Sequence, residues 1–497
     1  MKRFLLLILF VFMSFILLFS FHKKKNDIGA ETIISTHIPN DNLVYNVEID
    51  NILCPYNKLN SMYYFSTSDF SKYDIFFHSD FDVKYIIYGI DDNIYHFLVY
   101  DDKYYTMVSI LVDSIPVINI YDMGYFSNDA LSSRNDIISI VQSENEDKFV
   151  GIQIINLMQN NGTKYFTSIG NMSIRGASST FFQKKSYKLK LENDLGVLNV
   201  SNDKVWVLDA LYADPSKVRN KLSSDLWNLI NDNQKINNDL STQFVELFIN
   251  NEYRGLYVLK EKVDKSVTKI QDNGLLLKAV GHLDSTMVDR LFNNEYSIYD
   301  NKILNFEVKN YDKSSISSFL KKIKDFYYNN RNYDSIVNTF DLDNYINYKI
   351  FVSLLCGEDN VTSNQYYSMV NSNSKILVTP WDMDLTWGSF WNFNRPTLSE
   401  FIWDKDYDYN WLDESIFGEK DDKTFSLLKK RYWELRKNVI TMDTINSYLD
   451  SYKDILVNSG ATKRDSERWY NYDVVFEIEQ IREWARKRIF FLDEYFK

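Results

Sequence analysis

A stretch over residues 358–388 constrains the fold of this chain most, because it links a predicted helix to a predicted hairpin. Before it, apolar residues recur every four positions over 342–354, which is typical of an amphipathic helix. Asp341 is placed to cap the start of this helix, and Gly357 is placed to end it. Asp359 is therefore expected in a loop just past the helix end.

Two β-type runs follow, over residues 365–370 and 375–381, and a turn-like Asn-Ser-Asn-Ser over 371–374 separates them. Together they predict a hairpin. Because the second strand of a hairpin runs back along the first, the chain returns to the place where the hairpin began.

Four polar residues are expected to meet at the open end of this hairpin, namely Asp359, Asn364, Asp382 and Asp384. Asp382 and Asp384 are two positions apart on an extended segment, so they point to the same side. This order is what phosphoryl transfer requires: Asp359 takes the hydroxyl proton or orients the nucleophile, while Asn364 and Asp382 hold a divalent ion such as Mg²⁺ or Mn²⁺. Asp384 is a further candidate for a metal ligand. The His-Arg and Phe-Gly neighbours of ordinary protein kinases are absent, so a kinase here is an atypical one.

Three sequence blocks carry a resemblance to a known family. Residues 175–191 contain Arg-Gly-Ala-Ser-Ser and Lys-Lys-Ser-Tyr-Lys, residues 244–264 form a central hairpin, and residues 380–388 read Pro-Trp-Asp-Met-Asp-Leu-Thr-Trp-Gly. With these blocks the chain resembles the CotH kinase family, which is named for a spore-coat protein and is built as an atypical protein kinase. Two positions depart from the family's pattern: Ala177 stands where Asn is expected, and Gln183 stands where Pro is expected.

The resemblance implies an ATP- and metal-dependent kinase that phosphorylates Ser or Thr of secreted, surface or spore-coat proteins. Arg175 precedes a small-residue loop that suits phosphate. Lys188 and Lys190 share one face of the next predicted strand, which is either a solvated face or a phosphate contact, with Lys188 favoured. Arg219 lies in a predicted helix over 215–230 and either orders the phosphate site or forms a surface salt bridge. Adenine binding near Glu261 follows from analogy with kinases alone.

Composition and charge exclude several other classes. The 497 residues carry a net charge of −12, which argues against nucleic acid as a partner. Five histidines without ligand spacing make a zinc site or a Ser-His triad improbable. The two cysteines cannot form a disulfide framework, and Cys356 is expected as a small buried residue.

The pattern along the chain predicts an α+β protein. We expect an N-terminal signal anchor or signal peptide over 1–25, a β-rich domain with its linker over 26–147, and an atypical kinase domain over 148–497. Short alternating runs over 31–123 predict an antiparallel β-sandwich, and polar residues 127–147 predict the linker.

Within the kinase domain, the small lobe is expected over 148–265 and a mainly helical large lobe over 266–497. The predicted helices of the large lobe include 424–437 and 473–495. Arg488 and its basic neighbours Arg482, Arg486 and Lys487 lie among acidic residues and are expected on a solvated face.

The first residues predict a membrane location. Residues 4–21 are an uninterrupted apolar run between basic residues, which at about 1.5 Å per residue spans roughly 27 Å, enough for a bilayer. No Ala-x-Ala cleavage site is visible, so an uncleaved signal anchor is favoured over a signal peptide. An extracytoplasmic location for the rest of the chain follows partly from the family resemblance.

Two other classes of function stay open at this point. A non-catalytic scaffold or surface adhesin would use the same fold without phosphoryl transfer, and Ala177 leaves room for it. A glycoside hydrolase could use Asp359 and Asp382 as its acid and base. That mechanism has no use for Asn364 or for the lysine strand, so it ranks far below the kinase.

Overall fold

The computed structural model describes residues 29–58, 60–67, 69–91, 93–122, 148–155, 165–193, 204–232, 239–281, 302–303, 305–328, 332–357, 359–389, 415–417 and 423–497. The predicted membrane segment over 4–21 and the predicted linker over 127–147 lie outside these residues. Within the described ranges, none of the helices has both the length and the apolar composition needed to cross a membrane.

Helices and several sheets make this an α+β protein, as predicted. The chain folds as two compact units. The first unit holds Met1–Ser132, Phe149–Ile169 and Val245–Gly255, and the second holds Ser133–Lys148, Gly170–Phe244 and Leu256–Lys497. The predicted domain boundaries stay predictions.

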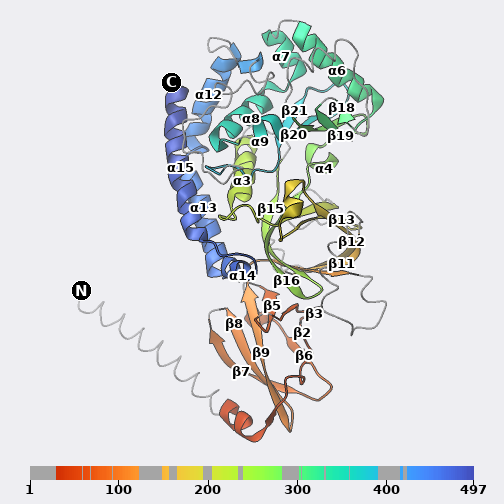
Figure 1. The fold of residues 1–497 in the computed structure, drawn as a ribbon, viewed down its shortest axis with the longest axis vertical. Coiled ribbons are helices and arrows are strands. Elements are labelled where there is room, and N and C mark those ends of the chain that lie inside the picture. The colour runs from red at the N-terminus through yellow and green to blue at the C-terminus, as the bar shows by residue number, and fades with distance from the viewer. Residues whose placement is uncertain are drawn as a thin grey trace, which may run out of the picture. The chain divides into compact units, whose positions relative to one another are not determined.

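The first unit contains two sheets (Figure 1), and their apolar side chains form one shared core. The larger has the strand order β4-β5-β9-β8-β7 with β1 beside β9, and the smaller has the order β3-β2-β6. Their strands are β1 (Ile38–Pro39), β2 (Asn46–Ile49), β3 (Ile52–Leu53), β4 (Tyr56–Asn57), β5 (Met62–Ser66), β6 (Ile75–His78), β7 (Lys84–Asp91), β8 (Ile94–Tyr100) and β9 (Tyr104–Asp113). Val47, Phe77, Phe97 and Ile110 bring side chains from both sheets into the core.

The predicted sandwich is wrong in one respect, because the larger sheet is mixed rather than antiparallel. Strands β1 and β5 both pair with β9 in the parallel sense. Alternation of apolar and polar residues predicts which face of a strand is buried, but it does not specify the neighbouring strand. A further strand of this unit, β10 (Val117–Asp122), pairs with β11 (Lys148–Ile155) and with β15 (Thr242–Ile249).

An antiparallel run of strands carries the charged face on which the candidate site is built, and residues 170–175, 186–191, 205–209 and 256–261 of this run belong to the second unit. The run consists of β12 (Tyr165–Arg175), β13 (Ser186–Leu191), β14 (Val205–Asp209) and β16 (Glu252–Glu261). Lys188 pairs with Val207, which pairs with Lys260. Opposed residues of an antiparallel pair point to the same face, as do residues two apart along a strand. Lys188 and Lys260 therefore share a face with Arg175 and Asp209.

A second sheet in this unit contains the predicted hairpin. Its strand order is β18-β19-β17-β20-β21, with bounds β17 (Leu275–Val280), β18 (Lys302–Ile303), β19 (Phe306–Asn310), β20 (Ser363–Met369) and β21 (Leu377–Pro380). Strands β20 and β21 are antiparallel, and Gln365 pairs with Pro380. The hairpin prediction is confirmed, and the chain leaves β21 beside the point where β20 begins.

The second unit also contains helices. The described ones are α3 (Arg219–Asp232), α4 (Lys265–Thr268), α6 (Lys313–Tyr328), α7 (Tyr333–Thr339), α8 (Leu342–Leu355), α9 (Asp359–Thr362), α12 (Lys423–Asn438), α13 (Met442–Asn458), α14 (Ala461–Arg468) and α15 (Val474–Tyr495). Figure 1 shows α15 running along α13, and it packs against α8 as well. The helices predicted over 424–437 and 473–495 are confirmed as α12 and α15.

Helix α8 begins as predicted but ends differently. The Asp341 side chain accepts a hydrogen bond from the Asn344 N–H at 3.1 Å, as expected of an N-cap. The left-handed residue that ends the helix is Cys356, with φ of 52°, and not Gly357. The backbone therefore turns one residue early, and Asp359 becomes the first residue of α9 instead of lying in a loop.

Helix α3 begins at Arg219, so the prediction that it starts at residue 215 is wrong. Lys217 has a left-handed φ of 62°, which a helix interior does not allow. The Asp214 carboxylate accepts hydrogen bonds from the backbone N–H groups of Ser216 at 2.9 Å and Arg219 at 3.0 Å. This carboxylate stabilises a turn ahead of the helix.

Arg488 is fully buried, which contradicts the predicted solvated face. It lies on the same side of α15 as the buried residues Ile481, Ala485 and Leu492, at helical spacing. Its Nε donates to the carbonyl oxygen of Ser353 at 2.8 Å, near the end of α8. The charged neighbours of Arg488 in the sequence suggested a solvated face, whereas its side chain donates to a carbonyl at the helix end that has no partner within the helix.

Candidate active site

Helix α9 places the first predicted site residue, Asp359, beside the segment that follows β21. The Asn360 Nδ2 donates to the carbonyl oxygen of Trp381 at 2.8 Å, and the Tyr348 hydroxyl donates to the carbonyl oxygen of Asn360 at 2.6 Å. The pKa of the half-buried Asp359 is raised, first by burial and then by the negative charge of Asp382. This carboxyl is therefore more basic than an ordinary aspartate.

Asp382 lies in a strained backbone conformation. Its φ is 56°, and that of Asn364 is 46°, both in the left-handed region that costs a non-glycine residue about 1–3 kcal/mol. The Trp381 N–H donates to the carbonyl oxygen of Asn364 at 2.8 Å. The structure thus brings Asp359, Asn364 and Asp382 together, and such strain is often found at functional sites. Their individual roles stay predictions.

Asp384 belongs to the same group of acidic side chains. Its pKa is raised well above the usual range, chiefly by burial, then by the charges of Asp382 and Asp209, while Lys260 opposes the shift. Carboxylates that repel one another in this way favour either a proton or a bound cation.

Lys260, on β16, is a cation that lies within 4 Å of two of the carboxylates in this region. Its Nζ lies 2.6 Å from Asp209 Oδ2 and 3.7 Å from Asp382 Oδ1. The same ammonium group lies 4.7 Å from the ring centroid of Trp381. Burial alone would raise the pKa of Asp209, but the ion pair with Lys260 brings that pKa below its usual value. Lys260 therefore links the strand face to the segment after β21.

Asn220, on α3, links the same two parts through its side-chain amide. Its Nδ2 donates to Asp209 Oδ2 at 3.0 Å, and its Oδ1 accepts from the Met383 N–H at 3.1 Å. Both ends of the amide are used, so α3 fixes the backbone between Asp382 and Asp384.

The sequence reasoning missed Lys260, Asp209 and Asn220 as site residues. Lys260 follows four apolar residues at 256–259, and Asp209 follows four at 205–208. A charged residue at the end of an apolar strand was the available signal, because a buried charge needs a partner. Asn220 was noticeable only as the neighbour of Arg219.

The strand face presents several cations beside this acidic group. The Arg175 guanidinium lies 5.4 Å from the ring centroid of Trp381. The pKa of Lys262 is lowered, first by burial and then by the positive charges of Lys309 and Lys188. Cations that repel one another next to carboxylates suit a ligand that carries phosphates and a metal ion.

Two other predicted residues lie differently. Lys190 is on the same face of β13 as Lys188, as predicted, but its side chain is exposed. Glu261 pairs with Trp206 and is buried on the opposite face of the strand from Lys260. The structure therefore does not bring the Glu261 side chain together with the charged face.

Arg219 is buried and contacts the chain just after Asp384. Its Nε donates to the carbonyl oxygen of Thr386 at 3.1 Å, and its guanidinium forms an ion pair with Asp214. The surface salt bridge weighed as an alternative is thereby excluded, because the pair is buried. Arg219 therefore holds the segment that follows Asp384 by binding a backbone carbonyl of that segment.

Gly388 offers a stability test of this segment. Its φ is +83°, and an added Cβ would lie 2.8 Å from Trp484 Cδ1 on α15. We expect Gly388→Ala to lower the free energy of unfolding by about 1–3 kcal/mol, because it adds both backbone strain and a clash. Urea unfolding measures the change. Gly29→Ala, where nothing lies within 4 Å of the added Cβ, is the control, and equal stability of the two variants would contradict this packing.

The donor set suits a hard divalent ion. Asp382, Asp384 and the Asn364 amide supply oxygen ligands, which Mg²⁺ and Mn²⁺ prefer. A cation would also relieve the repulsion that raises the pKa of Asp384. Among the residues that the structure describes, no cluster of three or more His, Cys, Asp or Glu side chains is arranged to hold a metal ion. The oxygen donors therefore suit a divalent ion chemically, and the Asn364 amide is needed as one of the ligands.

Comparison with known proteins decides the family. The family model described as CotH kinase protein matches residues 172–492, which is more than half of the chain. The chain belongs to the CotH kinase family. A comparison with curated proteins found no match.

The CotH match covers every part of the candidate site. It begins in β12 just before Arg175 and ends in α15 just after Arg488. It therefore includes the charged strand face, α3, α9 and the segment from Asp382 to Gly388. The family supports a kinase-like enzyme.

Proposed function

We propose that this chain is an ATP- and divalent-metal-dependent protein kinase that transfers the γ-phosphoryl group to Ser or Thr of secreted, surface or spore-coat proteins. The observation that carries this proposal is the placement of Asp359 against Asp382. The pKa of Asp359 is raised by burial and by the charge of Asp382. Asp382 itself lies on a strained backbone beside Asn364. Kinase chemistry requires such a division between a group that meets the hydroxyl and a group that holds the metal.

In this proposal Asp359 accepts the hydroxyl proton or orients the nucleophile. Its raised pKa suits that role, because a stronger base takes a proton more readily. Asp382 and Asn364 would hold the divalent ion, with Asp384 as a further ligand. A bound Mg²⁺ or Mn²⁺ supplies charge neutralisation for the phosphate oxygens.

The cationic strand face would hold the nucleotide. Lys188, Lys260 and Arg175 share that face, and Asp209 keeps Lys260 in place through a 2.6 Å ion pair. We also propose a bilobal arrangement, with β12, β13, β14 and β16 in the small lobe and α8 with the C-terminal helices in the large lobe. Its support is the family match together with the charged face.

A non-catalytic scaffold remains the alternative. The observation that leaves room for it is Ala177, which stands in the small-residue loop where the family pattern has Asn. Transfer of label from γ-labelled ATP to a Ser/Thr-containing protein, in wild type and Asp359→Ala, separates the two. A scaffold would transfer no label in either protein.

We propose that residues 4–21 anchor the protein in a membrane with the kinase domain outside the cytoplasm. The intact protein should then sediment with membranes and resist extraction by high salt or carbonate, because an apolar segment of this length partitions into the bilayer. A truncated chain that begins at Asp27 is the matched control and should be soluble. Recovery of a mature protein from the medium with its first residue near position 26 would contradict an uncleaved anchor.

A further inference from the structure

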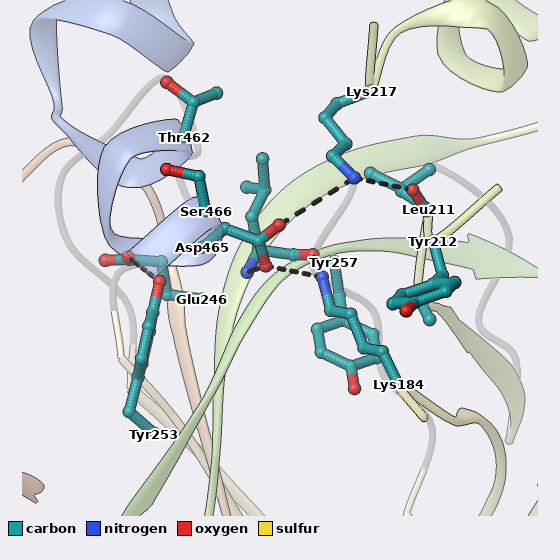
Figure 2. Close-up of polar contacts among 12 residues, drawn as sticks. Lys184, Leu211, Tyr212, Lys217, Glu246, Tyr253, Tyr257, Thr462, Asp465 and Ser466 are labelled. Carbon is teal, nitrogen blue, oxygen red and sulfur yellow. Dashed lines mark hydrogen bonds and ion pairs between the residues drawn. The ribbon is translucent and has the colours of Figure 1, made fainter. Parts of the chain in front are cut away.

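A buried charge cluster lies outside the candidate active site, where Asp465 of α14 meets two lysines (Figure 2). Asp465 Oδ1 lies 2.6 Å from Lys184 Nζ, and Asp465 Oδ2 lies 3.8 Å from Lys217 Nζ. The side chains of both lysines are 0% exposed, and that of Asp465 is 1% exposed. Charges without solvent contact are costly, so each of them needs its partner.

Further hydrogen bonds saturate the cluster. Lys184 Nζ donates to the carbonyl oxygen of Leu256 at 2.6 Å, and the Leu256 N–H donates to Asp465 Oδ1 at 2.9 Å. Lys217 Nζ donates to the carbonyl oxygen of Leu211 at 2.9 Å. Figure 2 shows both ammonium groups pointing toward the single carboxylate. One aspartate therefore holds three segments of the second unit together.

Aromatic rings line the cluster and add to the cost of disturbing it. Lys184 Nζ lies 4.6 Å from the ring centroid of Tyr257, and Lys217 Nζ lies 4.2 Å from that of Tyr472. The pKa of Lys217 is lowered to about 8, chiefly by burial and also by the charge of Lys184, while Asp465 opposes the shift. Two cations thus depend on one anion, and loss of that anion would leave both unbalanced.

Each of the three segments continues into a residue of the candidate site. Lys184 precedes β13, which carries Lys188. Leu256 lies in β16, which carries Lys260. Lys217 precedes α3, which carries Asn220 at its second position. The distance along the chain is three or four residues in every case, so a shift at the cluster reaches the site residue through only a short stretch of backbone.

We propose that Asp465 is a positioning residue that sets the nucleotide-binding face through Lys184, Leu256 and Lys217. This role rests on the proposed kinase function. Asp465 touches no reacting atom; it fixes the strands and the helix from which Lys188, Lys260 and Asn220 project. Its loss should weaken nucleotide binding more than it slows turnover at saturating nucleotide.

The test compares wild type with Asp465→Asn, which keeps the shape of the side chain and removes its charge. Glu467→Gln is the matched control, because Glu467 is exposed on the same helix. Hydrogen exchange is followed separately over 183–191, 211–219 and the 363–380 hairpin, and Mg²⁺–ATP affinity and turnover are measured below the melting temperature of the variant. We expect faster exchange in the first two segments and an unchanged hairpin.

We also expect the dissociation constant and KM for ATP to rise about tenfold in Asp465→Asn, within the range seen for indirect coupling, with kcat within about twofold of wild type. Wild-type exchange in both segments, or wild-type ATP affinity in Asp465→Asn, would overturn the proposal. So would equal effects in Glu467→Gln. If wild type itself binds no ATP, the proposed function fails, whereas unchanged exchange together with normal ATP binding overturns the positioning role alone.

A second variant covers the case in which Asp465→Asn does not fold. Lys217→Met leaves the Lys184–Asp465 ion pair with balanced charge, so this variant should fold. Faster exchange should then be confined to 211–219, with 183–191 unchanged. Loss of protection in neither segment would contradict a role for the cluster in holding them.

Discussion

Asp359→Asn should lower turnover by about 10² or more while leaving nucleotide affinity nearly unchanged. The substitution keeps the shape of the side chain but removes the charge that accepts a proton or orients the nucleophile. Because that charge meets the incoming hydroxyl, it acts mainly in the transition state. Steady-state kinetics with ATP and a protein acceptor, together with equilibrium ATP binding, measure the two effects separately.

The pH dependence of turnover provides a second, independent test of the role of Asp359. Asp359 must be ionised to act as a base, and burial together with the negative charge of Asp382 raises its pKa above that of an ordinary aspartate. Turnover in wild type should therefore fall with decreasing pH at a higher pH than an ordinary aspartate would give. Asp359→Asn should lack this acidic limb. An acidic limb that survives in the variant would assign it to another group.

Asp382→Asn should abolish the stabilisation that metal and ATP give to the folded protein, as well as turnover. A ligand that binds only the folded state at 100 times its dissociation constant adds about 2.7 kcal/mol. Asp382 is the predicted metal ligand, and its backbone is strained at φ of 56°. Because a metal ligand already contributes when the nucleotide binds, its loss weakens nucleotide binding as well as turnover. Thermal unfolding with Mg²⁺ or Mn²⁺ and ATP measures the effect. Asn364→Ala should show a milder form, because water can replace the amide.

Asp334→Asn is the matched control, since Asp334 is exposed in the first turn of α7. It should keep the full stabilisation by metal and ATP. The reverse pattern, with Asp359→Asn losing nucleotide and Asp382→Asn losing only turnover, would mean that the two roles are exchanged.

Local sequence patterns predicted the elements that carry the acidic residues. The four-residue apolar period over 342–354 and the two β-type runs gave α8 and the β20–β21 hairpin, because both signals lie within a short stretch of chain. The hairpin alone explains why Asp382 returns to the neighbourhood of Asp359. The pattern did not predict the left-handed turn at Cys356, because the neighbouring Gly357 was the more favourable residue for that conformation.

Contacts between distant parts of the sequence were beyond the pattern. Lys260 meets Asp209 because β16 pairs with β14, and pairing partners are not encoded in strand periodicity. Lys260 also meets Asp382, which follows a strand of a different sheet. Arg488 was misassigned for a related reason. Its helix face is set by what packs on α15, whereas its neighbours in sequence are charged.

We propose above all that the site around Asp359 and Asp382 transfers the phosphoryl group from ATP. The most direct measurement is incorporation of label from γ-labelled ATP into a Ser/Thr-containing protein acceptor in the presence of Mg²⁺ or Mn²⁺, with Asp334→Asn and Asp359→Asn run beside wild type. We expect metal-dependent incorporation by wild type and Asp334→Asn, and a fall of about 10² or more in Asp359→Asn. Equal incorporation by wild type and Asp359→Asn, or none by wild type across acceptors with either metal, would contradict it.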